Sequence, residues 1–425
     1  MDYKSFSAKE LENLLRDEQK RFKKLVKEGR NVDMTRGRPS KEQLEIAMPM
    51  LKAAGTYNYS AETSDARNYG DLGGTKACKA LFAELFGVKP EEVFVGDGSS
   101  LDLMYTLVHF AKQFGVLGAA PWNSLKKVKF ICPAPGYDRH FSICQQFGIE
   151  MITVRMKEDG PDMDVIESLV REDDSIKGIW CVPKYSNPTG ITFSDSVVER
   201  LATMKTAASD FRIFWDNAYM VHSLYDEDDK LKNIFDVARK AGTMNRIYSF
   251  ASTSKITFAG SGISAIAASE ENIKDIMGKM FFKCINANKV NQVMHVNFLK
   301  NADGVREVMK KHAALLRPKF ELFDKKFTEA FDGDVFVKWS KPRGGYFISV
   351  DVKSCAKRIV ELAATAGVKF TAAGATFPYK LDDMDSNIRV APSVPSLEEM
   401  EFAIDVMISA IRQARMEIVL AKTKS

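Results

Sequence analysis

Three polar side chains stand near the ends of three apolar segments, and together they could carry out chemistry on an amine. Asn187 lies in a Ser-Asn-Pro-Thr-Gly turn after one apolar run, and Asp216 ends the run Ile-Phe-Trp-Asp. Lys255 follows the run Tyr-Ser-Phe-Ala and three hydroxyl residues. A lysine in a crowded site has a lowered pKa and can form a Schiff base. An aspartate facing a heterocyclic nitrogen would hold that nitrogen protonated.

Small and hydroxyl residues form a candidate anion site between Gly96 and Ser100. The sequence there is Gly-Asp-Gly-Ser-Ser, between an expected strand and an expected helix. Free N–H groups at a helix start bind phosphate. The segment is not a Walker loop, because the Gly-Lys-Ser/Thr ending is missing. Taken singly, each of these features also has an ordinary explanation as a loop, a turn, a helix cap or a solvated lysine.

An alternation of strands and helices positions these residues. Continuous apolar strands separated by helical patterns indicate a mostly parallel sheet covered on both faces, and therefore an α/β fold. Ligands of such sheets bind beyond the carboxyl ends of the strands. We expect the strands at Glu92–Val95, Lys129–Cys132, Glu150–Val154, Gly178–Val182, Arg212–Trp215, Arg246–Phe250 and Ile263–Ala268.

The remaining segments predict an N-terminal arm and a smaller α+β domain. The arm begins with a helix over residues 7–29, where Ser7 and Glu10 can form a capping box. Further helices are expected at 41–53, 75–86, 101–114 and 396–414, and short strands within 339–350 and at 387–390. We therefore expect the arm and part of the small domain in residues 1–55, a large ligand-binding domain in 56–315 and the small C-terminal domain in 316–425.

The composition is that of a soluble globular protein in a reducing compartment. The net charge of +5 over 425 residues comes from scattered Lys and Arg, so nucleic acid is not expected as a partner. The six cysteines have irregular spacings without a Cys-x-x-Cys pair, which predicts buried thiols and neither disulfides nor a metal site. A polar N-terminus and the lack of a long apolar run predict a cytoplasmic protein without membrane contact.

The order of the motifs resembles the fold-type-I, class I/II aminotransferases that depend on pyridoxal 5′-phosphate (PLP). Asn187, Asp216 and Lys255 follow one another as in that family, and the resemblance covers roughly residues 30–410. It implies a large domain with a mostly parallel seven-stranded sheet. It also implies that Lys255 forms the Schiff base with PLP and later moves a proton between the substrate α-carbon and the cofactor.

The resemblance assigns the other cofactor contacts as well. Asp216 would pair with the pyridinium nitrogen, Asn187 and Tyr219 would bind the phenolic oxygen, and Tyr137 would stack on the ring. Tyr69, in Asn-Tyr-Gly, would reach the phosphate of a neighbouring subunit, which implies a homodimer. The implied phosphate ligands are Ser99, Ser100 and Ser252. The sequence departs from the family at one point. The phosphate-binding arginine that usually follows the lysine is missing, because residues 256–264 contain no basic residue. Helix N-termini, extra hydroxyls or a basic residue of the partner could replace it.

The substrate contacts are also implied by the resemblance. Arg389, in Asn-Ile-Arg-Val, would bind the α-carboxylate, with Asn187 and Gly37 beside the substrate. The loop around Gly37 and the motif from Cys132 to Phe141 are similar to a divergent bacterial group of aspartate aminotransferases. Aspartate needs a second cation for its distal carboxylate, and Arg139 is the preferred one, with Arg36 and Arg38 nearby. The reaction would convert aspartate and 2-oxoglutarate to oxaloacetate and glutamate.

Three alternatives remain open. An aromatic or kynurenine aminotransferase, or a PLP-dependent β-lyase, would keep the family and change the substrate. A PLP-binding transcriptional regulator would need a DNA-binding module before the domain, and about thirty residues before Arg36 are too few for one.

Overall fold

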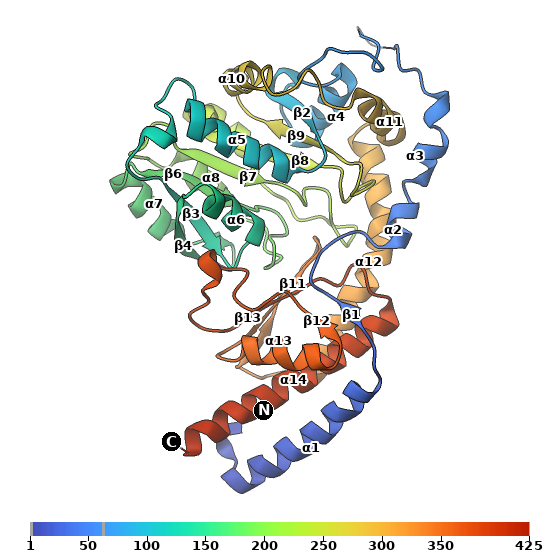
Figure 1. Ribbon diagram of the computed structural model, residues 1–425, viewed down its shortest axis with the longest axis vertical. Helices are drawn as coiled ribbons and strands as arrows, with labels where there is room; N and C mark the ends of the chain where they lie inside the picture. The colour runs from blue at the N-terminus through green and yellow to red at the C-terminus, as the bar shows by residue number, and fades with distance from the viewer. Residues whose placement is uncertain (1–2, 62–63, 425) are drawn as a thin grey trace.

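The computed structural model describes residues 3–61 and 64–424, and its central feature is an eight-stranded sheet (Figure 1). The strand order is β2-β9-β8-β7-β6-β3-β4-β5. The five strands from β8 to β4 in that order are parallel, whereas β9 and β5 run antiparallel to their neighbours. The strands are β2 Val93–Asp97, β3 Lys129–Ala134, β4 Glu150–Lys157, β5 Gly160–Pro161, β6 Ile176–Cys181, β7 Arg212–Asp216, β8 Ile247–Ser252 and β9 Ile263–Ala267.

The mostly parallel sheet and its seven expected strands are therefore confirmed. The eighth strand, β5, has only two residues and pairs with the last two residues of β4. Two residues are too few to produce a strand pattern, which needs four or more alternating positions. The sequence therefore offered no signal for β5.

Helices cover both faces of the sheet because every second side chain of a strand points to the same side. In β7, Ile213 and Trp215 pack into one apolar cluster and Phe214 into another. The first cluster includes helices α4, α7, α8 and α9, and the second α5, α6 and α10. These helices are α4 Lys76–Phe86, α5 Ser100–Phe114, α6 Asp138–Gln146, α7 Met163–Glu172, α8 Asp195–Thr203, α9 Ile234–Ala241 and α10 Glu270–Met280.

The N-terminal segment differs from the prediction in one helix. Helix α1, Ala8–Lys27, starts with the expected capping box of Ser7 and Glu10. The single helix expected over 41–53 is wrong, because the chain forms two short helices, α2 Lys41–Glu45 and α3 Met48–Lys52. Pro49 lies in the first turn of α3, where its missing N–H costs nothing. In a continuous helix the Pro49 ring would clash with the carbonyl of Glu45.

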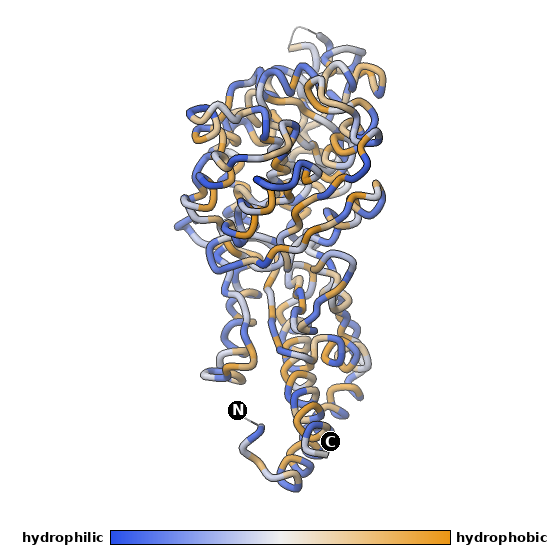
Figure 2. The backbone as a smooth tube through the Cα atoms, turned by 90° about the vertical axis from the view of Figure 1, so that its left-hand side faces the viewer, coloured by the Kyte–Doolittle hydropathy of each residue, from blue (hydrophilic) through white to orange (hydrophobic). Residues whose placement is uncertain are grey.

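A smaller α+β unit is built from both ends of the chain. Its sheet has the antiparallel order β10-β11-β13, and β1 pairs in parallel with β12. Helix α1 packs along α14 at the far end of the molecule (Figures 1 and 2). The expected boundary at residue 315 lies inside the unbroken helix α12, so the exact division stays a prediction. The elements are β1 Val32–Asp33, β10 Val337–Trp339, β11 Ile348–Val352, β12 Val368–Lys369, β13 Asn387–Val390, α11 Lys289–Leu299, α12 Ala302–Phe331, α13 Ala356–Thr365 and α14 Leu397–Lys424.

The cysteines are free thiols, as expected, and Cys132 and Cys181 are buried in β3 and β6. Among residues 3–61 and 64–424, no helix is both long enough and apolar enough to cross a bilayer.

Candidate active site

The carboxyl ends of β6, β7 and β8 open into a cavity of about 430 Å³. These strands are neighbours in the sheet, so the side chains that follow them converge. Of the predicted site residues, Tyr69 alone lies outside the cavity. The predicted residues that line it are Gly37, Ser99, Ser100, Tyr137, Arg139, Asn187, Asp216, Tyr219, Ser252, Lys255 and Arg389.

Lys255 lies three residues after the end of β8, between two aromatic rings. Its Nζ is 5.5 Å from the ring centre of Tyr219 and 5.9 Å from that of Tyr346. Burial lowers the pKa of the Lys255 amine, against the opposing charge of Asp216. The aromatic faces attract the ammonium only weakly. Lys255 therefore reaches its neutral, nucleophilic form more readily than a solvated lysine does.

Asp216, the last residue of β7, is buried with one oxygen paired and one free. Its Oδ2 lies 3.0 Å from Nε2 of His140, whose ring stacks on Trp180. Asp216 Oδ1 is buried and has no hydrogen-bond partner among the described residues. A buried carboxylate oxygen normally has a partner, so this atom calls for an N–H donor from a ligand. His140 was missed by the sequence analysis, although it belongs to the same motif as Tyr137.

Two tyrosines of the cavity keep their protons at neutral pH. Burial raises the pKa of Tyr219 well above its usual value, and burial together with Asp216 raises the pKa of Tyr137 to about 12. Both hydroxyls can therefore act as hydrogen-bond donors. The Tyr137 ring meets that of His140 edge to face, with ring centres 5.0 Å apart, which fixes it beside the Asp216 pair.

The expected anion site is formed by a helix start and two serines. Ser99 is the N-cap of α5, yet its side chain makes no capping hydrogen bond. The first N–H groups of α5 are therefore open to an anion. Ser252 and Ser254 both line the cavity, and the buried Ser254 Oγ has no partner within the described chain. Thr253 between them instead accepts a hydrogen bond from the Ile263 N–H.

Ser254 was missed, although it stands in the hydroxyl run that directly precedes Lys255. Strand alternation does not place it, because β8 ends at Ser252 and the chain turns there, with the Ile256 N–H donating to the Thr253 carbonyl. The segment 256–264, which lacks the usual arginine, supplies no cation, so these hydroxyls and the α5 N-terminus are the described groups that stand open to an anion there.

Arg389 on β13 is buried and held on several sides. Its Nη1 donates to Asp138 Oδ1 at 2.7 Å and to Asn187 Oδ1 at 3.4 Å. Its Nη2 donates to Thr371 Oγ1 at 3.2 Å, and the guanidinium lies 5.0 Å from the ring centre of Phe347. Asp138 could not be predicted as a partner of Arg389 from the sequence, because 251 positions separate the two residues.

The loop at Gly37 also lines the cavity, where it lies against Phe347. A Cβ on Gly37 would lie 2.6 Å from the Phe347 ring, so the close approach of loop and ring requires glycine. Arg36, Arg38 and Arg139 line the cavity together with Arg389. Arg139 is exposed and forms no ion pair with any described residue. The cavity therefore offers several guanidinium groups to a ligand with more than one negative charge.

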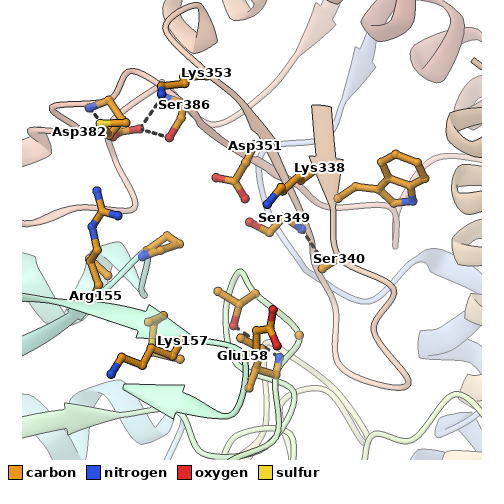
Figure 3. Close-up of a pocket in the computed structure, with 18 of the residues that line it drawn as sticks. Arg155, Lys157, Glu158, Lys338, Ser340, Ser349, Asp351, Lys353, Asp382 and Ser386 are labelled. Carbon is orange, nitrogen blue, oxygen red and sulfur yellow. Dashed lines mark hydrogen bonds between the residues drawn. The ribbon is translucent and has the colours of Figure 1, made fainter. Parts of the chain in front are cut away.

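A larger cavity of about 830 Å³ borders the turn that carries Asn187, and Figure 3 shows residues that line it. Thr189, Gly190 and Ile191 of that turn line it. Its charged side chains have both signs and come from β4, β10, β11 and the loop before β13, and none belongs to the predicted site. They include Arg155, Lys157, Glu158, Lys338, Asp351, Lys353 and Asp382. The smaller cavity is therefore the candidate active site, on its chemistry and not on its size.

The smaller cavity fits PLP. The partnerless oxygen of Asp216 suits a pyridinium N–H, and the uncapped start of α5 with the free hydroxyl of Ser254 suits a phosphate. Lys255 would supply the amine for the cofactor's aldehyde. Two protonated tyrosines and Asn187 complete the polar lining.

Comparison with known proteins gives the same picture. The family model described as aspartate amino-transferase matches residues 6–423. An aspartate aminotransferase of Corynebacterium glutamicum is 44% identical over 419 residues, which covers 97% of this chain and 96% of the relative. A crystal structure of an aspartate transaminase from the same organism has a TM-score of 0.94 at 43% identity and covers 98% and 99% of the two chains. An α-aminoadipate aminotransferase of Thermus thermophilus, with a TM-score of 0.71 at 20% identity over 92% and 93%, shares the fold.

Proposed function

The chain belongs to the aspartate aminotransferase family, and on this premise we propose that it transfers the amino group of aspartate to 2-oxoglutarate, giving oxaloacetate and glutamate. Its reaction class is transamination, and its cofactor is PLP. The choice of aspartate is supported by the name of the Corynebacterium glutamicum relative and by the arginines of the cavity.

The observation that carries the proposal is the arrangement of guanidinium groups around Lys255. Arg389 is buried and fixed, as suits a group that binds the α-carboxylate common to all amino acids. Arg139 is exposed and unpaired within the described chain, as suits a group that waits for a second carboxylate. Asp138 already neutralises part of the charge of Arg389. Arg139 is our preferred cation for the distal carboxylate, although Arg36 and Arg38 are also exposed and line the same cavity.

Each residue has a definite task in this proposal. PLP, when bound, withdraws electrons from the substrate α-carbon and carries the amino group between the two substrates. Lys255 would bind the cofactor and, as a free amine, would take the proton from the substrate α-carbon and deliver it to the carbon that was the cofactor's aldehyde carbon. Its lowered pKa favours the neutral amine that proton removal requires. Arg389 orients the substrate so that the α-proton faces this amine.

The remaining lining residues hold the cofactor. Asp216 keeps a proton on the pyridine nitrogen, and His140 keeps the Asp216 carboxylate in place. Tyr219 and Asn187 bind the phenolic oxygen, and Tyr137 covers the ring. The phosphate is bound by the start of α5 with the hydroxyls of Ser99, Ser100, Ser252 and Ser254.

We also propose a homodimer, with Tyr69 of each copy at the cofactor phosphate of the other. Tyr69 is 75% exposed, although it is large and aromatic. Phe281, Phe282 and Ile285, between α10 and α11, are 71%, 88% and 62% exposed. Apolar side chains in such a group are typical of a protein interface.

The free, mostly buried cysteines agree with an enzyme that works in the cytoplasm.

Purified holoenzyme, aspartate and 2-oxoglutarate provide the test, with oxaloacetate followed by a coupled dehydrogenase. We expect turnover with aspartate to exceed that with tyrosine, kynurenine or alanine as donor. Failure to form oxaloacetate would reject the proposed substrate. Reduction with borohydride followed by peptide mapping should place the pyridoxyl group on Lys255. A label on any other lysine would reject the cofactor assignment.

The variant Arg139→Ala tests the proposed preference for dicarboxylic substrates independently of the reaction class. We expect a large rise in KM for aspartate and 2-oxoglutarate and little change for alanine. Arg155→Ala is the matched control, because Arg155 is an exposed arginine that lines the other cavity. An equal loss with all donors would show that Arg139 is not the group that binds the distal carboxylate.

A further inference from the structure

Lys289, the first residue of α11, is a buried cation that the proposed chemistry does not use. Its side chain has no exposed surface, and its Nζ donates to Ser64 Oγ at 2.9 Å. The same ammonium pairs with Asp71 at 3.2 Å and reaches the carbonyl oxygens of Asp65 and Tyr69 at 3.4 Å. A buried ammonium is tolerated only with such partners. The Lys289 ammonium thus contacts four residues of the loop from residue 64 to 71.

This loop presents Tyr69 to the outside. The Tyr69 carbonyl faces Lys289, whereas the side chain is three-quarters exposed. The next residue, Gly70, has φ = +113°, a conformation that favours glycine. Ordering a loop costs conformational entropy, and the exposed Tyr69 ring makes too little contact within its own chain to offset that cost. Such an arrangement preorganises Tyr69 for contact with another molecule.

The start of α11 is also joined to the anion site of its own chain. The Asn288 N–H donates to Asp97 Oδ1 at 2.7 Å, and the Asn288 side chain caps α11. Asp97 ends β2 and directly precedes the segment Gly98–Ser100. One helix start therefore fixes both the segment that binds phosphate in this chain and the loop that carries the exposed tyrosine.

We propose that Lys289 is a positioning residue for the cofactor site of a second copy of this chain, holding the 64–71 loop so that Tyr69 can bind the phosphate there. The inference rests on the proposed homodimeric aminotransferase. Lys289 acts through Tyr69 and touches neither substrate nor cofactor. Loss of its ammonium frees the loop, so the partner site binds PLP less tightly. The proton transfer by Lys255 in a loaded site is unchanged.

A double-mutant cycle tests whether Lys289 acts through Tyr69. Lys289→Met removes the ammonium and keeps an unbranched side chain, and Tyr69→Phe removes only the hydroxyl. Each is expected to raise the Kd for PLP about tenfold, the cost of one hydrogen bond to a charged group. The double variant should be no weaker than the worse single variant. Additive losses would contradict the proposal, because they would show that the two residues act independently.

Hybrid dimers test whether the effect crosses the interface. Lys255→Ala removes the lysine that borohydride can label, so a hybrid has one labelled site. A subunit with Lys289→Met, paired with a Lys255→Ala subunit, receives an intact tyrosine loop and should retain PLP normally. A wild-type subunit, paired with a subunit carrying both changes, receives the altered loop and should lose PLP at the lower concentration. The reverse pattern would show that Lys289 acts within its own chain.

The remaining outcomes separate this inference from the proposed function. A wild-type chain that sediments as a monomer would reject the inference and the proposed homodimer, whereas a dimer with the reverse hybrid pattern would reject the inference alone. Failure to form oxaloacetate would reject the proposed substrate and leave the hybrid result standing. If Lys289→Met does not fold, Asp71→Asn replaces it, since it removes the ion pair and leaves Lys289 its three neutral partners. Asp71→Asn should then weaken PLP binding in the same hybrids. Unchanged binding there would also contradict the inference.

Discussion

His140 Nε2 lies 3.0 Å from Asp216 Oδ2 in the buried floor of the cavity, and the second oxygen of Asp216 has no partner within the described chain. The pair holds a carboxylate with one oxygen turned to a ligand. Asp216→Asn keeps the shape and removes the charge that holds a proton on the pyridine nitrogen. We expect kcat for aspartate to fall on the order of a hundredfold, measured by single-turnover kinetics.

His140→Gln is the companion to that variant. It leaves the charge of Asp216 in place and disturbs only its orientation, so we expect a clearly smaller loss of kcat. If the two variants were equally impaired, orientation and not charge would be the contribution of Asp216.

Burial of the Lys255 amine should lower the stability of the cofactor-free protein, by an amount that depends on pH. Its pKa is lowered in the folded state, so the unfolded chain binds more protons between that lowered pKa and 10.5. Stability should therefore rise with pH across this window. We expect cofactor-free Lys255→Met to melt at a higher temperature than the wild type at pH 7, with a gap that narrows toward pH 10. A constant gap would contradict the lowered pKa.

His295 should make the protein sensitive to acid. Its ring is buried, Nδ1 lies 2.8 Å from the Asn291 carbonyl and Nε2 2.8 Å from Thr257 Oγ1. Burial lowers the pKa of His295 to about 4 from 6.5, so the unfolded chain takes up a proton first as the pH falls. The folded protein therefore has its full stability with respect to His295 above pH 6.5. It loses unfolding free energy on the order of 3 kcal/mol as the pH falls toward 4.

Urea unfolding of the cofactor-free protein at pH 7 and pH 5 measures this effect. His295→Gln should lose less unfolding free energy between the two pH values than the wild type does. His222 and His312 are also buried with lowered pKa values, so some loss should remain in the variant. Identical losses in both proteins would show that His295 does not titrate as described.

Arg389→Lys should weaken substrate binding for every donor. Lysine keeps the charge but cannot pair with a carboxylate through two parallel N–H groups, nor lie flat against Phe347. We expect KM for aspartate and for alanine to rise on the order of a hundredfold, with PLP binding unchanged. Selective loss of aspartate alone would assign Arg389 to the distal carboxylate instead.

Gly37→Ala tests the close contact of the covering loop. The added methyl group would meet the Phe347 ring at 2.6 Å and displace either the loop or the ring that supports Arg389. We expect KM to rise about tenfold with little change in melting temperature, because an exposed loop absorbs the shift. Gly55→Ala is the control, since a Cβ there has no neighbour within 4 Å. Equal kinetics for both variants would refute the contact.

Local signals explain why much of this fold could be predicted. The capping box of Ser7 and Glu10 and the end of β7 at Asp216 are encoded within a few residues. The convergence of Asn187, Asp216 and Lys255 followed from a general property of parallel sheets. The break between α2 and α3 was missed although Pro49 signalled it, because the helical pattern continues across the proline.

Contacts between distant segments explain what the sequence analysis missed. Asp138 and Arg389 are 251 positions apart, and Lys289 is more than two hundred positions from the loop that it holds. Each residue looks like an ordinary charged side chain until the fold brings its partner close. Ser254 is the exception, since it lies in the hydroxyl run just before Lys255. The roles of the site residues stay predictions until the variants are measured.

The pairing of the two chain ends has a consequence for synthesis. Val32 in β1 pairs with Val368 in β12, and α1 packs along α14. On the ribosome, α1 and β1 are made more than three hundred residues before the segments that they pack against. The apolar side of α1 therefore stays uncovered while the residues of the central sheet are made. This makes assembly of the small α+β unit a late event in folding.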